Sequence, residues 1–137
     1  LDGVTYINDS KGTNVDSTLK AIATMMKPTV MILGGYDKHV DMSRLCQAIP
    51  NSNIQKVVLI GDTAPLIQKG LEEVGFTHYV SAGHDFKKAV TLARDMAEPG
   101  WNVLLSPACA SFDMFADYEE RGRIFKEIVG ALESAAP

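Results

Sequence analysis

Three short stretches contain most of the side chains that can hold a small anionic ligand. They are residues 8–14 (NDSKGTN), 34–38 (GGYDK) and 106–115 (SPACASFDMF). Each follows an apolar run that is typical of a buried strand, and each combines small, hydroxyl or charged residues. Lysine ammonium groups, hydroxyls and the backbone N–H groups at a helix start all bind carboxylates or phosphates. We therefore predict that the three stretches meet at one edge of a sheet and bind an acidic small molecule.

The elements that position these stretches alternate between strand and helix. An alternating pattern predicts a short strand at residues 4–7, apolar runs predict strands at 30–33, 57–60 and 103–105, and a weaker strand is expected at 77–80. Helical spacing of apolar side chains predicts five helices. The first follows Asn14 and carries Val15, Leu19, Ile22 and Met26, and a short second one spans residues 42–48. The third follows Thr63 and carries Leu66, Ile67, Leu71 and Val74, the fourth carries Phe86 to Met96, and the fifth begins near Tyr118. Asn14 and Thr63 are expected to cap their helices, and Gly75 is expected to end one.

This order of elements predicts the fold class. Strands that are apolar throughout must be covered on both faces. We expect an α/β fold, namely a Rossmann-like open, mostly parallel sheet of about five to six strands with helices on both faces. Ligands of such sheets bind beyond the carboxyl ends of the strands, which is where the three stretches lie.

Composition limits the class of protein. The 137 residues are expected to form one domain, residues 1–137, and 46% hydrophobic with 22% charged residues is typical of a globular chain. A net charge of −4 argues against binding to nucleic acid or to anionic membranes. The two cysteines are widely separated, and the sequence has neither an apolar run of membrane-spanning length nor a signal peptide. These features favour a cytoplasmic protein. The chain begins with Leu1 and enters a strand almost at once, so we expect a piece of a longer protein.

Several common catalytic and nucleotide-binding fingerprints are missing from the sequence. Residues 11–13 (KGT) resemble the end of a P-loop, but G-x-x-x-x-G-K-[ST] is absent, and so is the G-x-G-x-x-G of dinucleotide-binding folds. No G-x-S-x-G elbow surrounds Ser111, so a serine nucleophile is disfavoured. Taken one at a time, the loops at 8–14 and 34–38 are also compatible with solvated turns.

The remaining reactive side chains have plainer interpretations. His39, His78 and His84 lack the spacing of metal ligands, so no metal site is expected, and the loop histidines are interpreted as solvated. Cys109 is interpreted as a small buried thiol. Arg121 is expected to lie on a solvated helix start, and the alternative is that it braces the Ser111 loop through a charge-assisted bond.

Taken together, the three stretches, followed by residues 120–122 (ERG), resemble the C-terminal domain of the Mur ligases over essentially the whole chain. Within that family they are most similar to the branch that adds D-glutamate to UDP-N-acetylmuramoyl-L-alanine in peptidoglycan synthesis. The D-N-P-R signature of the diaminopimelate-adding branch is absent.

The resemblance implies a cytoplasmic, three-domain, ATP-dependent ligase. In such enzymes an acyl phosphate forms on the alanyl carboxylate, and the amine of D-glutamate attacks it. ATP and Mg²⁺ are held mainly by a central domain whose P-loop and carbamylated lysine have no counterpart in this chain. The resemblance therefore implies no catalytic residue within this domain alone, and we expect the isolated domain to be inactive.

The resemblance also implies roles for individual residues in binding D-glutamate. Thr13 and Lys38 would hold one carboxylate. Ser111, with the backbone near Phe112 and Tyr118, would hold the other. A dianionic amino acid needs two separate groups of donors, and these loops supply them.

Further implied contacts concern the nucleotide. Lys11 would lie beside the amino-acid and phosphate site, and Asp9 would face the ribose. Tyr36 departs from members that carry an acidic residue there, so a nucleotide contact at that position stays open. Two alternatives also stay open: a folylpolyglutamate-synthase-like ligase domain, and a noncatalytic small-molecule-binding α/β domain. The stretch 106–115 favours the Mur ligases over the folate enzyme.

Overall fold

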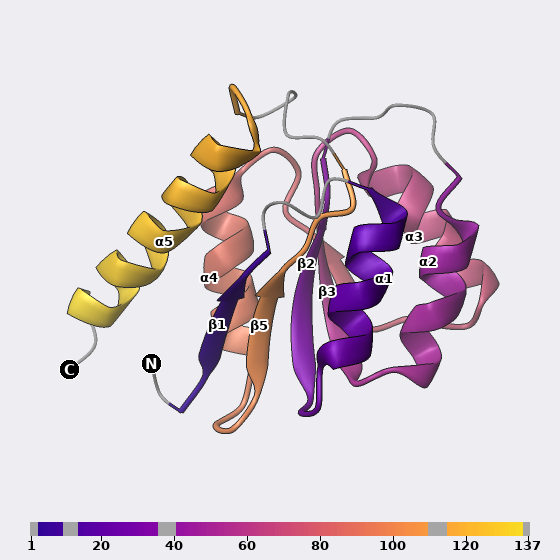
Figure 1. Ribbon diagram of the computed structural model, residues 1–137, viewed down its shortest axis with the longest axis horizontal. Coiled ribbons are helices and arrows are strands. Elements are labelled where there is room, and N and C mark those ends of the chain that lie inside the picture. Colours follow the sequence, from indigo (N-terminus) through magenta and orange to yellow (C-terminus); the bar gives the residue numbers. More distant parts are fainter. Residues whose placement is uncertain (1–2, 10–13, 36–40, 110–114, 136–137) are drawn as a thin grey trace.

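A computed structural model of the chain describes residues 3–9, 14–35, 41–109 and 115–135 (Figure 1). Its described residues form one five-stranded sheet in the order β1-β5-β2-β3-β4, in which every neighbouring pair is parallel. The strands are β1 (Thr5–Asn8), β2 (Thr29–Gly34), β3 (Ile54–Ile60), β4 (Tyr79–Ser81) and β5 (Asn102–Leu105). The predicted α/β class with a parallel open sheet is confirmed.

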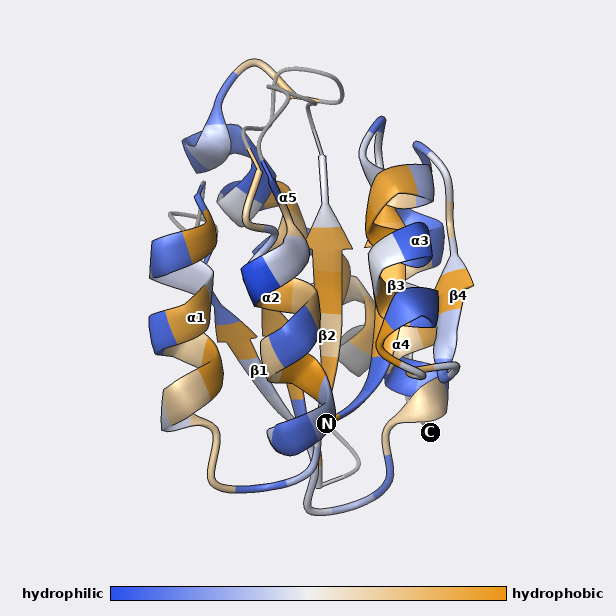
Figure 2. Ribbon diagram, turned by 90° about the vertical axis from the view of Figure 1, so that its right-hand side faces the viewer, coloured by the Kyte–Doolittle hydropathy of each residue, from blue (hydrophilic) through white to orange (hydrophobic). Residues whose placement is uncertain are grey.

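Helices cover both faces of the sheet, as the apolar strands require (Figures 1 and 2). One face packs against α1 (Val15–Thr24), α2 (Ser43–Ala48) and α3 (Ala64–Glu73), and the other against α4 (Phe86–Met96) and α5 (Tyr118–Ala135). A short 3-10 turn, η1 (Ile49–Asn51), follows α2. None of the helices in the described part of the chain is both long and apolar enough to cross a membrane.

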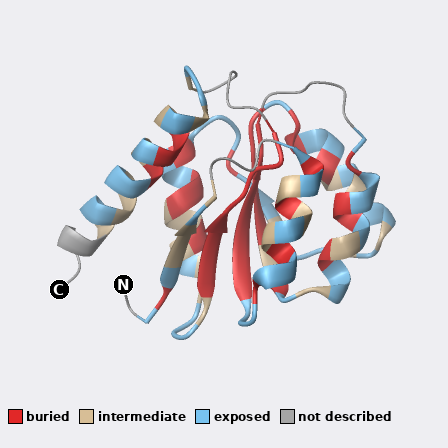
Figure 3. Ribbon diagram, in the orientation of Figure 1, coloured by how far each residue is buried: buried red, intermediate tan, exposed pale blue. Residues whose placement is uncertain are grey.

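Alternate side chains of each central strand enter different cores. On β2, Met31 and Leu33 belong to the core under α1, α2 and α3, whereas Val30 and Ile32 belong to the core under α4 and α5. Every residue of β2 and β5 is buried (Figure 3). This two-sided burial explains why these strands read as unbroken apolar runs rather than as alternating ones.

The ends of two helices follow the sequence prediction, and one does not. Asn14 caps α1, because its side-chain oxygen accepts a hydrogen bond of 2.9 Å from the Ser17 backbone N–H. Gly75, with φ of +78°, follows α3 as predicted. The placement of Met26 on the buried face of α1 was wrong. The helix ends at Thr24, and the extended backbone at Met25 leaves Met26 85% exposed.

The segment before α3 also departs from the prediction. The Thr63 side chain makes no capping bond to α3. Its hydroxyl instead accepts a 2.9 Å hydrogen bond from the backbone N–H of Gly35, in the loop after β2. Leu66, predicted to face the core, is exposed, because the buried stripe of α3 runs through Ile67 and Leu71.

Candidate functional site

The described parts of the three sequence stretches meet at the carboxyl edge of the sheet, at the top of Figure 1. The backbone N–H of Asp9 donates to the carbonyl of Leu105 at 2.7 Å, which joins the loop after β1 to the end of β5. The N–H of Gly34 donates to the carbonyl of Pro107 at 2.9 Å, which joins the end of β2 to the loop after β5. β5 lies between β1 and β2, so the three loops leave neighbouring strands.

Gly34 is required by a close backbone approach at this edge. Its φ is +121°, and a Cβ atom added there would lie 2.1 Å from the carbonyl oxygen of Ile60 on the adjacent strand β3. No side chain fits that space without displacing a central strand. The next residue, Gly35, is buried and bonded to Thr63, as described above. These contacts fix the backbone at the end of β2.

A buried pair of hydroxyls lies under the loop after β1. The Ser106 hydroxyl donates to the Asp9 carboxylate oxygen Oδ2 at 2.7 Å. The Thr18 hydroxyl, from α1, lies 3.0 Å from the Ser106 Oγ and 3.3 Å from the Ser106 carbonyl oxygen. Thr18 and Ser106 are fully buried, whereas Asp9 is half-buried and reaches the surface.

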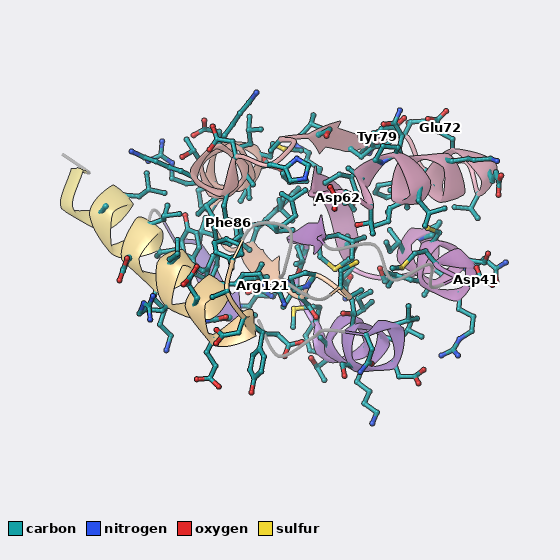
Figure 4. All side chains as sticks on the ribbon, turned by 90° about the horizontal axis from the view of Figure 1, so that it is seen from above. Asp41, Asp62, Glu72, Tyr79, Phe86 and Arg121 are labelled. Atoms are coloured by element: carbon teal, nitrogen blue, oxygen red, sulfur yellow. The ribbon has the colours of Figure 1, made fainter. Side chains whose placement is uncertain are left out.

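Arg121 stabilises the loop after β5 from inside the protein. Its side chain is 1% exposed, and its Nη1 donates to the backbone carbonyl of Cys109 at 2.9 Å (Figure 4). The expectation of a solvated Arg121 was therefore wrong, and the alternative of a bracing arginine is correct for the described end of that loop. Cys109 is a buried thiol, as predicted, with its Sγ 3.5 Å from the Thr63 hydroxyl.

The start of α5 is held against β1. The Asn8 side-chain amide donates to the carbonyl of Gly122 at 3.1 Å. Asp117 accepts a hydrogen bond of 2.8 Å from the Glu120 backbone N–H, so it satisfies one of the free donors of the first turn. These two contacts place Tyr118 beside β1, and the half-buried Tyr118 is a residue for which we expect a ligand role.

A cleft of about 390 Å³ lies between the end of β1 and the start of α5. It is lined by Asn8, Asp9, Tyr118, Glu119, Gly122, Arg123 and Lys126. Two of the predicted site residues, Asp9 and Tyr118, thus line the same cleft. The other five, Lys11, Thr13, Lys38, Ser111 and Phe112, lie outside the described residues, as do Tyr36 and His39.

The opposite part of the same sheet edge carries a histidine–aspartate pair. The Nε2 of His84 lies 2.8 Å from the Oδ1 of Asp62, and both side chains are exposed (Figure 4). His78 is exposed as well, so both described histidines lie at the surface, as interpreted from the sequence. Within the described ranges, no three histidine, cysteine, aspartate or glutamate side chains gather as metal ligands would.

Shifted pKa values occur outside the cleft. Burial, followed by the negative charges of Glu73 and Asp41, raises the pKa of Cys46 to about 11, so this thiol stays protonated. Hydrogen bonds from the side chain and backbone of Ser43 lower the pKa of Asp41, and a hydrogen bond to Glu72 raises that of Tyr79. None of these groups lines the cleft beside β1.

Sequence reasoning assigned no role to Thr18 or to Ser106. Thr18 lies three residues after Val15 and four before Ile22, so it belongs to the buried stripe of α1, where a hydroxyl is unusual. A polar residue on an otherwise apolar helical face was therefore the available signal. The partner of the Thr18 hydroxyl is Ser106, which lies 88 positions away in the sequence, so no local pattern identifies it.

Known proteins resemble this chain over nearly its full length. The family model described as "Mur ligase, glutamate ligase domain" matches residues 1–109. The chain is 46% identical over 133 residues to the UDP-N-acetylmuramoylalanine--D-glutamate ligase of Pelotomaculum thermopropionicum. It is 42% and 44% identical, over 132 and 128 residues, to proteins of the same name from Caldicellulosiruptor saccharolyticus and Desulfitobacterium hafniense.

These alignments cover 97%, 96% and 93% of this chain but only 29%, 29% and 28% of the relatives. The chain therefore spans less than a third of the length of the curated relatives it matches. The family resemblance inferred from the three loop motifs is confirmed. Because the family model covers most of its residues, the chain belongs to the family of Mur ligase glutamate ligase domains.

Proposed function

We propose that this chain is the C-terminal, D-glutamate-binding domain of an ATP-dependent ligase that joins D-glutamate to UDP-N-acetylmuramoyl-L-alanine. The observation that carries the proposal is the 42–46% identity, over nearly the whole chain, to relatives named for that ligation. The described ends of the three polar loops lie together at the carboxyl edge of the sheet, which supports the proposal because this is where open α/β sheets bind small ligands.

In this proposal the ligand contacts come from the three loops. Thr13 and Lys38 bind one carboxylate of D-glutamate, and Ser111, with the backbone at Phe112 and Tyr118, binds the other. The placement of Tyr118 beside Asp9 and the bonds that join the loop ends are compatible with one shared site. Two separated groups of donors fix both ends of a dianionic amino acid, so its amine points in one direction.

The chemistry then depends on how the amine is presented. ATP, which with Mg²⁺ would be held mainly by a central domain outside this chain, supplies the γ-phosphoryl group that converts the alanyl carboxylate to an acyl phosphate, and ADP is the leaving group. The D-glutamate amine forms the new C–N bond, inorganic phosphate leaves with the electrons of the broken C–O bond, and the amine loses one proton. Lys11, beside the phosphate, stabilises the charge that develops on its oxygens.

The remaining parts of the proposal follow from this chemistry. An acyl phosphate reacts with water, so it requires a closed site to which several domains contribute, and the isolated chain is proposed to be inactive. The UDP-linked precursor and ATP are proposed as partners of the whole enzyme. We also assign the enzyme to the cytoplasm, which agrees with two buried cysteines that form no disulfide.

The test is steady-state kinetics of the full-length enzyme with Lys38→Ala, varying D-glutamate and ATP separately. Loss of a charge-assisted contact of about 1.5–3 kcal/mol lowers kcat/KM for D-glutamate at least about tenfold, with little change for ATP. Lys27→Ala is the matched control, because Lys27 is exposed and precedes the amino end of β2, away from the loops.

Two results would contradict the proposal. Unchanged kinetics of Lys38→Ala would remove Lys38 from the site, and with it the three-loop arrangement. Ligation of L-glutamate in preference to D-glutamate by the unmodified enzyme would favour the folylpolyglutamate-synthase-like alternative.

A further inference from the structure

The hydrogen bonds among Thr18, Ser106 and Asp9 can run in only one direction. A hydroxyl has a single proton, and an ionised carboxylate can only accept. The Ser106 proton is therefore used at 2.7 Å on the Asp9 Oδ2. Thr18 must then donate, and its proton is shared between the Ser106 Oγ at 3.0 Å and the Ser106 carbonyl at 3.3 Å. The result is a relay of two donors that ends on a carboxylate.

Stability alone does not account for this pair of hydroxyls. Both side chains are fully buried, and the surrounding core positions, such as Val15 and Leu104, are apolar. An alanine and a valine would fill the same places without polar atoms to satisfy, and such exchanges are often nearly neutral when both partners are replaced. What the hydroxyls add is a fixed orientation of the Asp9 carboxylate.

Asp9 lies where a fixed carboxylate can contact a ligand. It lines the cleft shared with Tyr118, and it also lines a second cleft of about 390 Å³ on the side of α1, beside Ser17 and Lys20. It directly precedes residues 10–13, and its backbone is bonded to the end of β5. A carboxylate held through one oxygen presents the other in a constant direction, and the family resemblance implies that the Asp9 carboxylate faces the ribose of the nucleotide.

We propose that Ser106 is a positioning residue, which orients Asp9 so that this carboxylate accepts the ribose hydroxyls of the nucleotide. The inference rests on the proposed function, because it takes the nucleotide to be ATP. Ser106 is buried behind Asp9 and acts on the nucleotide only through it. Thr18 holds the Ser106 hydroxyl in the donating orientation, so α1 also contributes to the geometry of the nucleotide contact.

The experiment is a double-mutant cycle in the full-length enzyme, with ATP and D-glutamate varied separately. Ser106→Ala is expected to raise KM for ATP about 5–20-fold, with kcat and KM for D-glutamate changed less than about twofold. In an Asp9→Ala background the same substitution is expected to change KM for ATP less than about twofold, because nothing is left to orient. Direct binding of a fluorescent ATP analogue provides a second reading of the same differences.

Thr29→Val is the matched control for loss of a buried hydroxyl. Thr29 is also fully buried and donates to the Lys27 carbonyl at 2.9 Å, but it lies at the amino end of β2, opposite the loops. We expect this variant to lose stability without any rise in KM for ATP. Thr18→Val keeps the bond from Ser106 to Asp9, so it is expected to raise KM for ATP less than Ser106→Ala does.

Three outcomes would overturn the inference. They are an unchanged KM for ATP in Ser106→Ala, a loss that falls on D-glutamate instead, and an effect that persists in the Asp9→Ala background. Should Ser106→Ala fail to fold, Ser106→Cys, which keeps a side chain of similar shape but is only a weak donor, is measured in the same cycle, and an unchanged KM for ATP overturns the inference. Failure of the proposed function shows separately, as an unmodified enzyme that binds ATP but does not ligate D-glutamate.

Discussion

Replacing Gly34 by alanine tests whether the backbone geometry at the end of β2 is required by the fold. The added Cβ would lie 2.1 Å from the Ile60 carbonyl oxygen and 3.2 Å from both the carbon and the nitrogen of Ile60. All three atoms belong to the backbone of a central strand, so no side-chain rotation relieves the overlap. The φ of +121° is unfavourable for any residue with a side chain.

The expected loss of stability follows from these two terms. A backbone conformation of this kind costs roughly 1–3 kcal/mol for a residue with a side chain. Overpacking that displaces neighbouring backbone costs a further 1–3 kcal/mol or so. We expect Gly34→Ala to lower the free energy of unfolding by about 2–6 kcal/mol, a large part of the 5–15 kcal/mol or so that holds a typical domain folded.

Substitutions at two other glycines distinguish the cost of the backbone conformation from the cost of the steric overlap. Gly75 has φ of +78° and open space around it, so Gly75→Ala should cost only the conformational term, about 1–2 kcal/mol. Gly130 lies within α5, also with open space, and Gly130→Ala should increase stability by roughly 0.5–1 kcal/mol.

Urea unfolding of the three variants beside the parent chain, followed by circular dichroism, measures these differences. A loss in Gly34→Ala that is no larger than the loss in Gly75→Ala would show that the strand pair adjusts freely. Gly34 would then not be required by the backbone geometry at the end of β2.

Three smaller predictions concern other contacts. Arg121→Met should lower the free energy of unfolding by about 1.5–3 kcal/mol, because the Cys109 carbonyl loses a charged donor; equal urea midpoints would contradict the bracing role. The Cys46 thiol, whose pKa is raised to about 11, should resist alkylation at pH 8 until urea is added. Because the thiol ionises near pH 9 in the unfolded chain, its contribution to the free energy of unfolding is complete below that pH and is lost as the pH rises through about 11. A Cys46→Ala variant should not show this part of the decline in stability at high pH. Asn14→Ala should cost about 1 kcal/mol through loss of the cap to Ser17, and an unchanged thermal midpoint would refute the cap.

Local interactions made much of the fold predictable. The unbroken apolar runs at residues 30–33 of β2, 57–60 of β3 and 103–105 of β5 indicate strands that are covered on both faces, and a parallel sheet follows from that burial. Asn14 caps its helix through a residue only three positions away, so the sequence alone suffices there. The weak strand was predicted at residues 77–80, but β4 spans Tyr79–Ser81, because this segment has neither a continuous apolar run nor a clear alternation to mark its ends.

Part of the candidate site was predictable for the same reason, since glycine, hydroxyl and charged residues directly follow the apolar strands. The meeting of the described ends of the three stretches was predictable because parallel strands place all their carboxyl ends at one edge. Asp9 and Tyr118, proposed from the family motifs, line one cleft although they lie at opposite ends of the chain.

The sequence by itself determined the order of the strands and helices along the chain, the parallel arrangement of the sheet and the family. Each of these depends on short patterns of neighbouring residues. The tertiary structure alone decided that Arg121 is buried, that Thr63 bonds to Gly35 rather than capping α3, and that Ser106 donates to Asp9. The separation of 97 positions between Ser106 and Asp9 explains why. The partner of a buried polar group is set by which distant segments the folded sheet brings together, and no local pattern records that choice.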